Sequence, residues 1–327
     1  MCRVRGERVR TPEAARGKLC ARATSGSRDP VIAQIADIGG IPMSALLIEV
    51  PRPRAVIVAL HGGGTSSAYF DCPGHPELSL LRTAAAAGFT ALALDRPGYG
   101  SSQRFSDRFN DPQVRVDAMY TAIDAHLGAL PRGAGLFLAA HSAGCQLALR
   151  MSADRRGGQL LGLELGGTGR RRSPISDDIL ARPLSLRQRI SELLWQPAHL
   201  YPPALAGGTL IGSGGPRPET AAGGSWGELM FPKLAARVRI PVHYSVGEHE
   251  RVWRTDAEGL ADVASTFTMA RRLVLAVHPH SGHNLSVGYA ATAYHLSLLA
   301  FAEECVLARE ISDSPIATTL LNDSVKG

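Results

Sequence analysis

Continuous apolar runs that end in glycine or a polar residue recur along the chain, each followed by a helical segment. The runs AVIVAL (55–60), FTALAL (89–94) and GLFLAA (135–140) do not alternate with polar residues, which is typical of strands buried on both faces. Helical segments are expected between them at 75–88 and 111–130. Buried strands that alternate with helices predict an α/β fold with a mostly parallel sheet covered on both faces.

The alternation continues on both sides of one interruption. Residues 168–238 break the rhythm with helical pieces and a glycine-rich stretch, and we interpret them as a helical cap over one end of the sheet. The remaining expected elements are two strands within 31–51, a strand at 160–167, a strand at 240–246, a helix at 255–267, a strand at 272–278 and a helix at 286–309. The sequence thus predicts a basic tail (1–30), a core (31–167 and 239–310), a cap or lid insertion (168–238) and a C-terminal tail (311–327).

The net charge of +6 is concentrated at the beginning of the chain. Residues 1–30 carry eight basic and three acidic residues, so the rest of the chain is nearly neutral. This segment has no aromatic residue for stacking on a base and no apolar stretch of the secretory type. We interpret it as a disordered tail or an over-long start of the reading frame, in preference to a nucleic-acid-binding arm, and expect no nucleic-acid partner.

Cysteine usage and hydropathy indicate the cellular compartment of the protein. The five cysteines are scattered, without CxxC or metal-finger spacing, so we expect no disulfide framework and no metal. The odd count and the lack of a secretory signal favour a reducing, cytoplasmic environment. No apolar run approaches the ~18–20 residues of a membrane-spanning helix, so no membrane partner is expected. The oligomeric state stays open, with a homodimer among the alternatives.

The third buried run ends in Ser142, within the pentapeptide AHSAG (140–144). The pentapeptide nearly matches the G-x-S-x-G nucleophile elbow, in which a strand turns sharply into a helix and projects the serine above the sheet. Alanine replaces the first glycine, which adds one methyl group where backbones approach closely. A serine here can equally cap the following helix, so the pentapeptide alone leaves both roles open.

The first buried run ends in the glycine-rich sequence HGGG (61–64). Glycines let backbone N–H groups face the space above the sheet without obstruction. Donors aimed at a developing alkoxide form an oxyanion hole, and each is worth about 2.7–4 kcal/mol in the transition state. We assign these donors to Gly63, Gly64 and Ala143. A phosphate-binding loop is disfavoured because no lysine follows the glycines, whereas a flexible glycine turn is the simpler alternative.

Two loops that follow the late strands offer an acid and a base for Ser142. We favour Glu250 as the acid, since the strand should end near Gly247, and His283 as the base, since it lies in a loop beyond its strand. The order Ser142…Glu250…His283 is the order of a serine–acid–histidine triad on an open parallel sheet. The alternatives are Glu248 for the acid, and His280 and then His278 for the base.

With these motifs taken together, the sequence resembles the α/β-hydrolase superfamily over about residues 30–310. The motifs that carry the resemblance are HGGG, LDRPGYGSS, AHSAG, VGEHE and SGH, each after an apolar strand. The resemblance implies an eight-stranded, mostly parallel sheet with a lid after the sixth strand. It disfavours dehalogenases and epoxide hydrolases, whose elbow carries aspartate where this chain has Ser142. Glutamate at 250 departs from the aspartate that is more usual in the family.

Three residues near these motifs are candidates for substrate binding: His141, Trp195 and Trp226. Packing of the cap on the core explains the tryptophans equally well. The run Arg170-Arg171-Arg172 could meet an acidic substrate, although a solvated loop is the simpler interpretation. Asp95 ends a strand near the predicted site, and we interpret it as structural.

The function predicted from these features is that of a serine hydrolase without cofactor, which cleaves a carboxylic ester or thioester of a small, apolar substrate. Ser142 is the expected nucleophile, His283 the base and Glu250 the residue that orients it. The alternative keeps the fold and replaces hydrolysis with acyl transfer, cyclisation or another non-hydrolytic reaction, or with ligand binding alone. The sequence does not define the substrate, because specificity depends on the shape of the cap and pocket.

Overall fold

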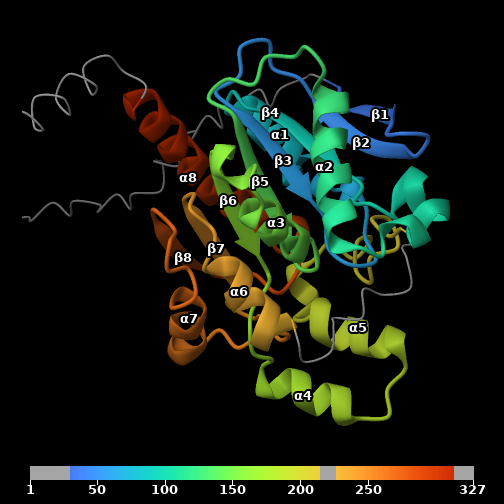
Figure 1. Cartoon of the computed structure of the whole chain (residues 1–327). Helices are drawn as coiled ribbons and strands as arrows, with labels where there is room; N and C mark the ends of the chain where they lie inside the picture. The colour runs from blue at the N-terminus through green and yellow to red at the C-terminus, as the bar shows by residue number, and fades with distance from the viewer. Residues whose placement is uncertain (1–29, 214–225, 313–327) are drawn as a thin grey trace, which may run out of the picture.

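The computed structural model describes residues 30–213 and 226–312, which form an eight-stranded sheet between layers of helices (Figure 1). The strand order is β1-β2-β4-β3-β5-β6-β7-β8. β1 and β2 are antiparallel to their neighbours, whereas β3 to β8 run parallel. The predicted α/β class and mostly parallel sheet are confirmed. The strands are β1 (Ile32–Asp37), β2 (Pro42–Ile48), β3 (Val56–Leu60), β4 (Thr90–Leu94), β5 (Leu136–His141), β6 (Gly162–Gly166), β7 (Val242–Gly247) and β8 (Leu273–His278).

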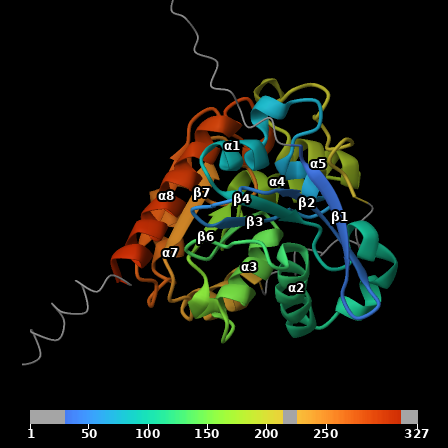
Figure 2. The same ribbon diagram turned by 90° about the horizontal axis from the view of Figure 1, so that it is seen from above.

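Helices cover both faces of the sheet, as the view from above shows (Figure 2). α1 and α8 pack against each other on one face, and α2 and α3 lie together on the other. Each face has its own cluster of buried apolar side chains, so the sheet separates two cores. The helices are α1 (Leu80–Ala86), α2 (Pro112–Leu127), α3 (Gly144–Ala153), α4 (Pro174–Ala181), α5 (Leu186–Leu194), α6 (Phe231–Ala235), α7 (Ala257–Ala264) and α8 (Ala291–Ser312).

Burial along the strands explains why the sequence shows both continuous and interrupted apolar runs. Every residue of β3 and of β4 is buried, because each strand has a neighbour on both sides and a helical layer on both faces. The two edge strands, β1 and β8, each keep several residues exposed. The loops of the carboxyl edge therefore emerge from the ends of buried central strands, which set their positions.

Side-chain caps decide where several helices begin. Asp111 caps α2 as predicted, and its Oδ1 accepts a hydrogen bond of 2.7 Å from the Gln113 amide. The single helix expected at 75–88 is divided, because the Ser79 hydroxyl accepts from the Arg82 amide (3.2 Å) and starts α1 there. A short 3-10 turn precedes that cap. Gly88, with φ of +86°, follows the end of α1, in the left-handed conformation common after helices.

The C-terminal helix also differs from its predicted span. The helix expected at 286–309 is preceded by a 3-10 turn at Leu285–Val287, begins at Ala291 and continues to Ser312. The predicted tails fall almost wholly on residues 1–29 and 313–327, which lie outside the described residues. Among the described helices, none combines the length and the apolar composition that crossing a membrane requires.

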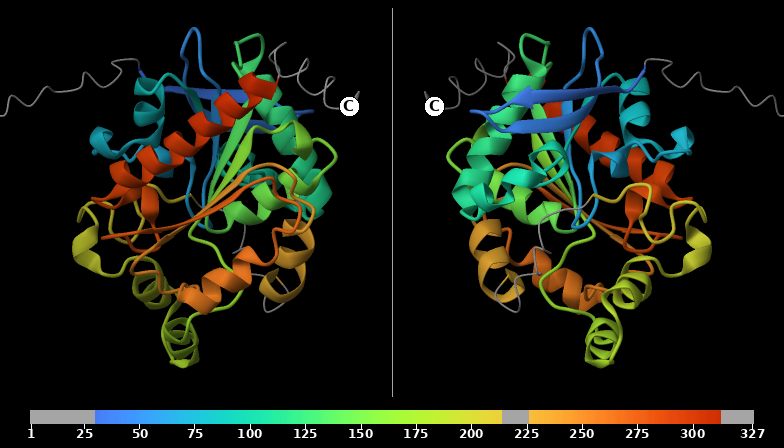
Figure 3. Two further views of the ribbon diagram at one scale, coloured as in Figure 1. Left: turned by 90° about the vertical axis from the view of Figure 1, so that its left-hand side faces the viewer. Right: turned by 90° about the vertical axis from the view of Figure 1, so that its right-hand side faces the viewer.

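The segment between β6 and β7 corresponds to the predicted cap at 168–238. Its helices α4 and α5 project together at one end of the molecule (Figure 3). A backbone bridge between Thr65 and Gly212 joins it to the loop after β3. The last described part of the segment does not project outward. Trp226 and α6 belong to the apolar cluster that packs on α3. Residues 214–225 of the predicted cap lie outside the described residues.

Buried histidines predict how stability depends on pH. His61, His141 and His295 are at most 3% exposed, and burial lowers the pKa of His61 well below its ordinary value and those of His141 and His295 to about 3. Imidazoles in the unfolded chain have pKa values of about 6.5. At pH values between the lowered pKa of the folded state and about 6.5, the unfolded chain therefore binds more protons than the folded chain. We expect the free energy of unfolding to fall between pH 7.5 and 5.5, by about 1.4 kcal/mol for each such histidine.

Urea unfolding at the two pH values measures this dependence. The variant His295→Leu removes one of the three groups, so its loss of stability over the same interval should be smaller by about 1.4 kcal/mol. The pKa of His243 is raised, because the adjacent Glu164 carboxylate outweighs the effect of burial. His243 therefore makes an opposite contribution to the pH dependence of stability in both the wild type and the His295→Leu variant. An unchanged pH dependence in the variant would contradict the assignment.

Candidate active site

Ser142 lies on the turn between β5 and α3, and its backbone is in the left-handed region with φ of +51°. This conformation is unfavourable for a residue with a side chain. It is maintained by neighbours: the Ser142 amide donates to the Gly166 carbonyl at 2.8 Å. A methyl group at Gly144 would lie only 2.4 Å from the Leu60 carbonyl oxygen. The turn is therefore tight, and only glycine fits its last position.

Ala140, which stands where the elbow motif has its first glycine, is a residue of β5. It is paired with Leu60 of β3 and Leu165 of β6 and is 2% exposed. Its methyl group belongs to the apolar cluster on the α3 face of the sheet. The extra carbon is accommodated by packing, so the sharp turn forms without glycine at this position.

A chain of hydrogen bonds links Ser142 to a histidine and a carboxylate. The Ser142 hydroxyl oxygen lies 3.0 Å from His283 Nε2. His283 Nδ1 lies 2.9 Å and 3.1 Å from the two carboxylate oxygens of Glu250. The carboxylate can only accept, so Nδ1 carries the proton and donates to Glu250, which leaves Nε2 to accept from the Ser142 hydroxyl. His283 is 1% exposed and Glu250 7% exposed.

The two glutamates of the acid loop have different surroundings. Glu250 Oε1 also accepts from the Val252 amide at 2.7 Å, so the loop itself holds the carboxylate toward His283. Glu248 points elsewhere and accepts from the His280 amide at 2.9 Å, a bond that lowers the pKa of its exposed carboxyl. The structure thus places Glu250, and not Glu248, against His283.

The two alternative histidines do not reach Ser142. His278 is buried at the end of β8, where its Nε2 lies 3.2 Å from the hydroxyl oxygen of Ser245 on the neighbouring strand β7. His280 is exposed and has a positive φ of 55°. The loop that begins after β8 therefore turns only His283 inward.

The predicted oxyanion donors lie beside Ser142. A methyl group built on Gly62 would lie 3.2 Å from the Ser142 Cβ, and one on Gly63 would lie 3.6 Å from the Ala143 Cβ. Within the described ranges, the amides of Gly63 and Ala143 donate to no protein acceptor. Gly64 is turned toward the inserted segment, because its carbonyl accepts from the Ser213 amide at 3.2 Å. Gly63 and Ala143 are accordingly the better placed pair.

His141 does not line an open site, contrary to its assignment as a substrate-binding residue. Its ring is 3% exposed and stacks on Tyr69 with a centroid distance of 4.5 Å. Its Nε2 donates to the His283 carbonyl at 2.9 Å. Burial lowers the pKa of His141 to about 3, so the ring is neutral near pH 7. His141 supports the backbone of His283 from behind.

The two tryptophans assigned to substrate binding are both buried. Trp226 packs on Phe231 and under the Arg150 guanidinium of α3, so the structure does not bring it to Ser142. Trp195 packs edge-to-face on Tyr201, whose hydroxyl accepts from the Asn284 amide. It therefore lies one layer behind the loop of His283, where it supports the wall of the site.

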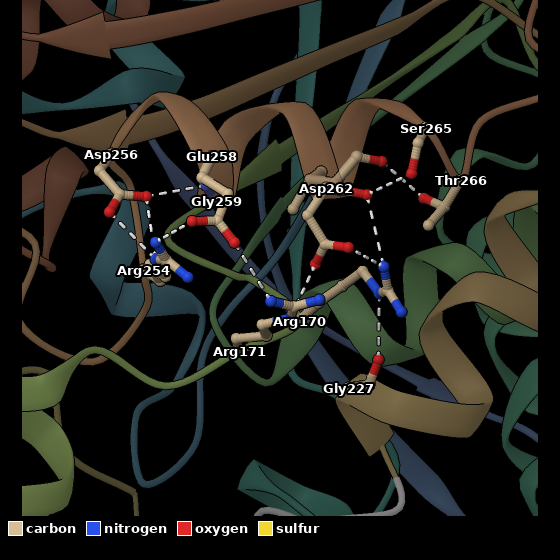
Figure 4. A network of polar contacts seen from close by, with 11 residues as sticks. Arg170, Arg171, Gly227, Arg254, Asp256, Glu258, Gly259, Asp262, Ser265 and Thr266 are labelled. Carbon is tan, nitrogen blue, oxygen red and sulfur yellow. Dashed lines mark hydrogen bonds and ion pairs between the residues drawn. The ribbon is translucent and has the colours of Figure 1, made fainter.

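Two residues of the arginine run after β6, Arg170 and Arg171, contact α7 (Figure 4). Arg170 forms an ion pair with Asp262 and donates to the Gly227 carbonyl, while Arg171 contacts Glu258 and Asp262. These contacts bind the start of the inserted segment to the helix that follows the acid loop. Arg170 and Arg171 therefore have a structural role, which the run of charges in the sequence did not distinguish from a solvated loop.

The sequence interpretation gave no role to Arg96, which lies beside Gly62. Arg96 is 2% exposed, its Nη2 donates to the Gly62 carbonyl at 3.1 Å, and its guanidinium lies 4.6 Å from the centre of the Tyr99 ring. The only sequence signal was its place directly after the second buried run. Asp95 accepts from the Ser67 amide at 2.7 Å and from the Ser44 hydroxyl, so it braces the loops beside the site. Among the described side chains, no three metal-ligating groups are arranged to hold an ion.

A parallel sheet flanked by helices, with a serine on a strained strand-to-helix turn, defines the α/β-hydrolase class. The chain belongs to the alpha/beta hydrolase family, whose model matches residues 57–293. The recognition of the family from the motifs is thereby confirmed.

The individual proteins that resemble this chain match it only over a short stretch or at low sequence identity. Protein ABHD14A of Danio rerio is 38% identical over 73 residues, which cover 22% of this chain and 25% of that protein. The chain thus matches about a quarter of the length of this relative. A soluble variant of monoglyceride lipase from Saccharomyces cerevisiae, solved with a substrate analogue, has a TM-score of 0.64 at 13% identity, with 86% of this chain and 96% of that chain covered.

A thioesterase domain from the curacin biosynthetic pathway has a TM-score of 0.56 at 18% identity. The alignment covers 83% of this chain and all of the domain. At these identities, the two solved structures share the fold with this chain, and the family match is the finding that defines its class.

The close approach at Gly144 yields a test of the turn. The variant Gly144→Ala places a methyl group 2.4 Å from the Leu60 carbonyl oxygen, so we expect it to lower the free energy of unfolding by about 1–3 kcal/mol. Gly158→Ala is the matched control, because a methyl group there meets nothing within 4 Å. Urea unfolding of both variants measures the difference, and equal stabilities would contradict the tight turn.

Proposed function

We propose that the protein is a serine hydrolase that cleaves a carboxylic ester or thioester of a small, apolar substrate. The observation that carries the proposal is the hydrogen-bond chain from Ser142 through His283 to Glu250 on a strained turn. A serine hydroxyl becomes an effective nucleophile only when a base accepts its proton and a third group orients that base. Two contacts support both requirements: His283 Nε2 lies 3.0 Å from the Ser142 hydroxyl oxygen, and His283 Nδ1 lies 2.9 and 3.1 Å from the carboxylate oxygens of Glu250.

The proposed reaction has two halves. Ser142 attacks the substrate carbonyl carbon while its proton moves to His283 Nε2, and Glu250 stabilises the imidazolium that forms. The alkoxide oxygen accepts hydrogen bonds from the Gly63 and Ala143 amides. His283 then protonates the departing alcohol or thiol as the carbon–oxygen or carbon–sulfur bond breaks, which leaves an acyl-enzyme. Water repeats the sequence and releases the acid.

Transfer of the acyl group to an acceptor other than water uses the same first half. Hydrolysis is favoured here because it requires no second binding site for an acceptor. Labelling of the wild-type protein by a fluorophosphonate, without turnover over a panel of esters and thioesters of increasing chain length, would replace hydrolysis with transfer or cyclisation. Absence of both labelling and turnover would leave a ligand-binding role.

The variant Ser142→Ala tests the nucleophile. We expect it to lose p-nitrophenyl ester turnover by at least about 10⁴-fold, because the acyl-enzyme cannot form, and to lose fluorophosphonate labelling. Ser265→Ala, which removes an exposed hydroxyl bonded to the Asp262 carbonyl on α7, is the control and should retain both. Undiminished turnover in Ser142→Ala would disprove the assignment.

The matched pair Glu250→Gln and Glu248→Gln tests the acid. Glutamine at 250 presents an amide that can stabilise the wrong imidazole tautomer and carries no charge for the imidazolium, so kcat should fall by about 10²- to 10⁴-fold. Glutamine at the exposed position 248 should change kcat by less than about twofold, since surface charges contribute little. Steady-state kinetics on one ester substrate compares them, and equal losses would contradict the role of Glu250.

A further inference from the structure

The carbonyl oxygen of Gly62 is surrounded by three hydrogen-bond donors. His61 Nδ1 lies at 2.8 Å, the Thr65 hydroxyl at 3.1 Å and Arg96 Nη2 at 3.1 Å. A carbonyl oxygen has two lone pairs and rarely engages more than two strong donors. Three donors from three positions of the chain therefore restrain this one oxygen unusually firmly.

The protonation state of His61 follows from its second contact. The Arg96 amide donates to His61 Nε2 at 3.1 Å, so Nε2 is the acceptor of the ring and Nδ1 carries the proton. His61 is fully buried, and burial keeps its pKa well below the ordinary value. The ring is therefore a fixed neutral donor to the Gly62 carbonyl.

The direction of that carbonyl determines the direction of the next amide. The Gly62 carbonyl and the Gly63 N–H belong to one planar trans peptide, so they point in opposite directions. With the oxygen held on the side of His61, Thr65 and Arg96, the N–H projects to the other side. Gly63 lies beside Ala143 there, and Gly62 lies beside Ser142.

Glycine on both sides of this peptide makes such a restraint necessary. Glycine reaches left-handed and right-handed conformations at similar cost, so the peptide can rotate more easily than between larger residues. A rotated peptide would aim its oxygen, and not its N–H, at the alkoxide formed on the substrate. The same glycines that leave room for the substrate therefore leave the donor free to turn unless its carbonyl is held.

We propose that Arg96, together with Thr65 and His61, positions the oxyanion donor by holding the Gly62 carbonyl so that the Gly63 N–H faces the reacting carbonyl oxygen. The proposal rests on the proposed hydrolase function and adds a role for a buried arginine on the loop after β4. Burying a guanidinium is costly because the charge loses its contact with water. The proposed role explains why the Arg96 guanidinium is buried against the backbone of the glycine loop. Arg96 acts through Gly63 and does not contact the reacting atoms itself.

Thr65→Val and Thr65→Ser form the sharpest pair of variants. Valine has the shape of threonine and lacks the hydroxyl, so we expect kcat on a p-nitrophenyl ester to fall about 3- to 10-fold with KM changed less than about twofold. Serine keeps the hydroxyl and should retain wild-type kcat within about twofold. The control Thr121→Val removes a hydroxyl that donates to the Asp117 carbonyl on α2 and should leave kcat unchanged.

Arg96→Met and Arg96→Lys extend the series. We expect kcat to fall about 10- to 100-fold in the methionine variant, below the 10²- to 10³-fold loss of an entire oxyanion donor, with partial recovery in lysine. Because the Ser142–His283–Glu250 chain is untouched, the midpoint of the kcat/KM–pH profile should not move. A trifluoromethyl ketone, whose adduct carries an oxyanion, should lose affinity in proportion to kcat/KM. A shifted midpoint with unchanged inhibitor affinity would overturn the proposal.

Backbone NMR of protein labelled with ¹⁵N-glycine reads the orientation of the Gly63 amide without reference to activity. Thr65→Val and Arg96→Met should shift or broaden the Gly63 resonance, whereas Thr121→Val should not. An unchanged Gly63 resonance in both variants would overturn the proposal even if the enzyme is active. If the wild type neither reacts with fluorophosphonate nor hydrolyses esters, the hydrolase function fails, while a shifted Gly63 resonance still supports the restraint on the peptide.

Discussion

Parallel pairing of β3 with β5 is the constraint on which the arrangement of the site depends. Leu60 of β3 is paired with Ala140 of β5, so the two strands end side by side. This register places the glycine loop next to the turn of Ser142, at a backbone separation so small that a methyl group on Gly144 would collide with the Leu60 carbonyl. β6, β7 and β8 continue the same edge, so the acid loop after β7 and the loop of His283 after β8 come within reach of Ser142. A slip of one residue would turn these side chains to the wrong face.

The segment after β6 contributes to the site by supporting the acid loop. The Ser173 and Arg254 amides donate to the Val252 and Arg171 carbonyls at 3.0 and 2.9 Å, so the two stretches of chain run side by side. The indole N–H of Trp253, which is also in the acid loop, donates to the Gly167 carbonyl at 3.1 Å. Since Val252 also donates to Glu250, the inserted segment and the carboxylate share one hydrogen-bonded framework. The ion pairs of Arg170 and Arg171 with α7 close that framework on its outer side.

Sequence patterns were sufficient for the fold and for the neighbourhood of the site, and insufficient for the direction of individual side chains. The buried runs and their terminal motifs placed Ser142, Glu250 and His283 at one edge. The choice between Glu250 and Glu248 depended on which way a short loop turns, which is decided by the Val252 amide. Trp226 was assigned to the substrate because it is aromatic and lies in the inserted segment, yet it packs on α3. His141 adjoins the nucleophile in sequence, but it is the last residue of β5 and its ring stacks on Tyr69, whereas Ser142 lies on the turn that follows.

The sequence by itself determined the class of fold, because strands with continuous apolar runs can be buried only in a sheet covered on both faces. It also determined which kinds of side chain gather at the carboxyl edge. Only the tertiary structure decided which nitrogen faces which oxygen, how Ala140 is accommodated, and that Arg96 contacts the glycine loop. The reason is physical: local periodicity specifies which face of an element is buried, whereas hydrogen bonds between loops depend on distances set by strands far apart in the chain.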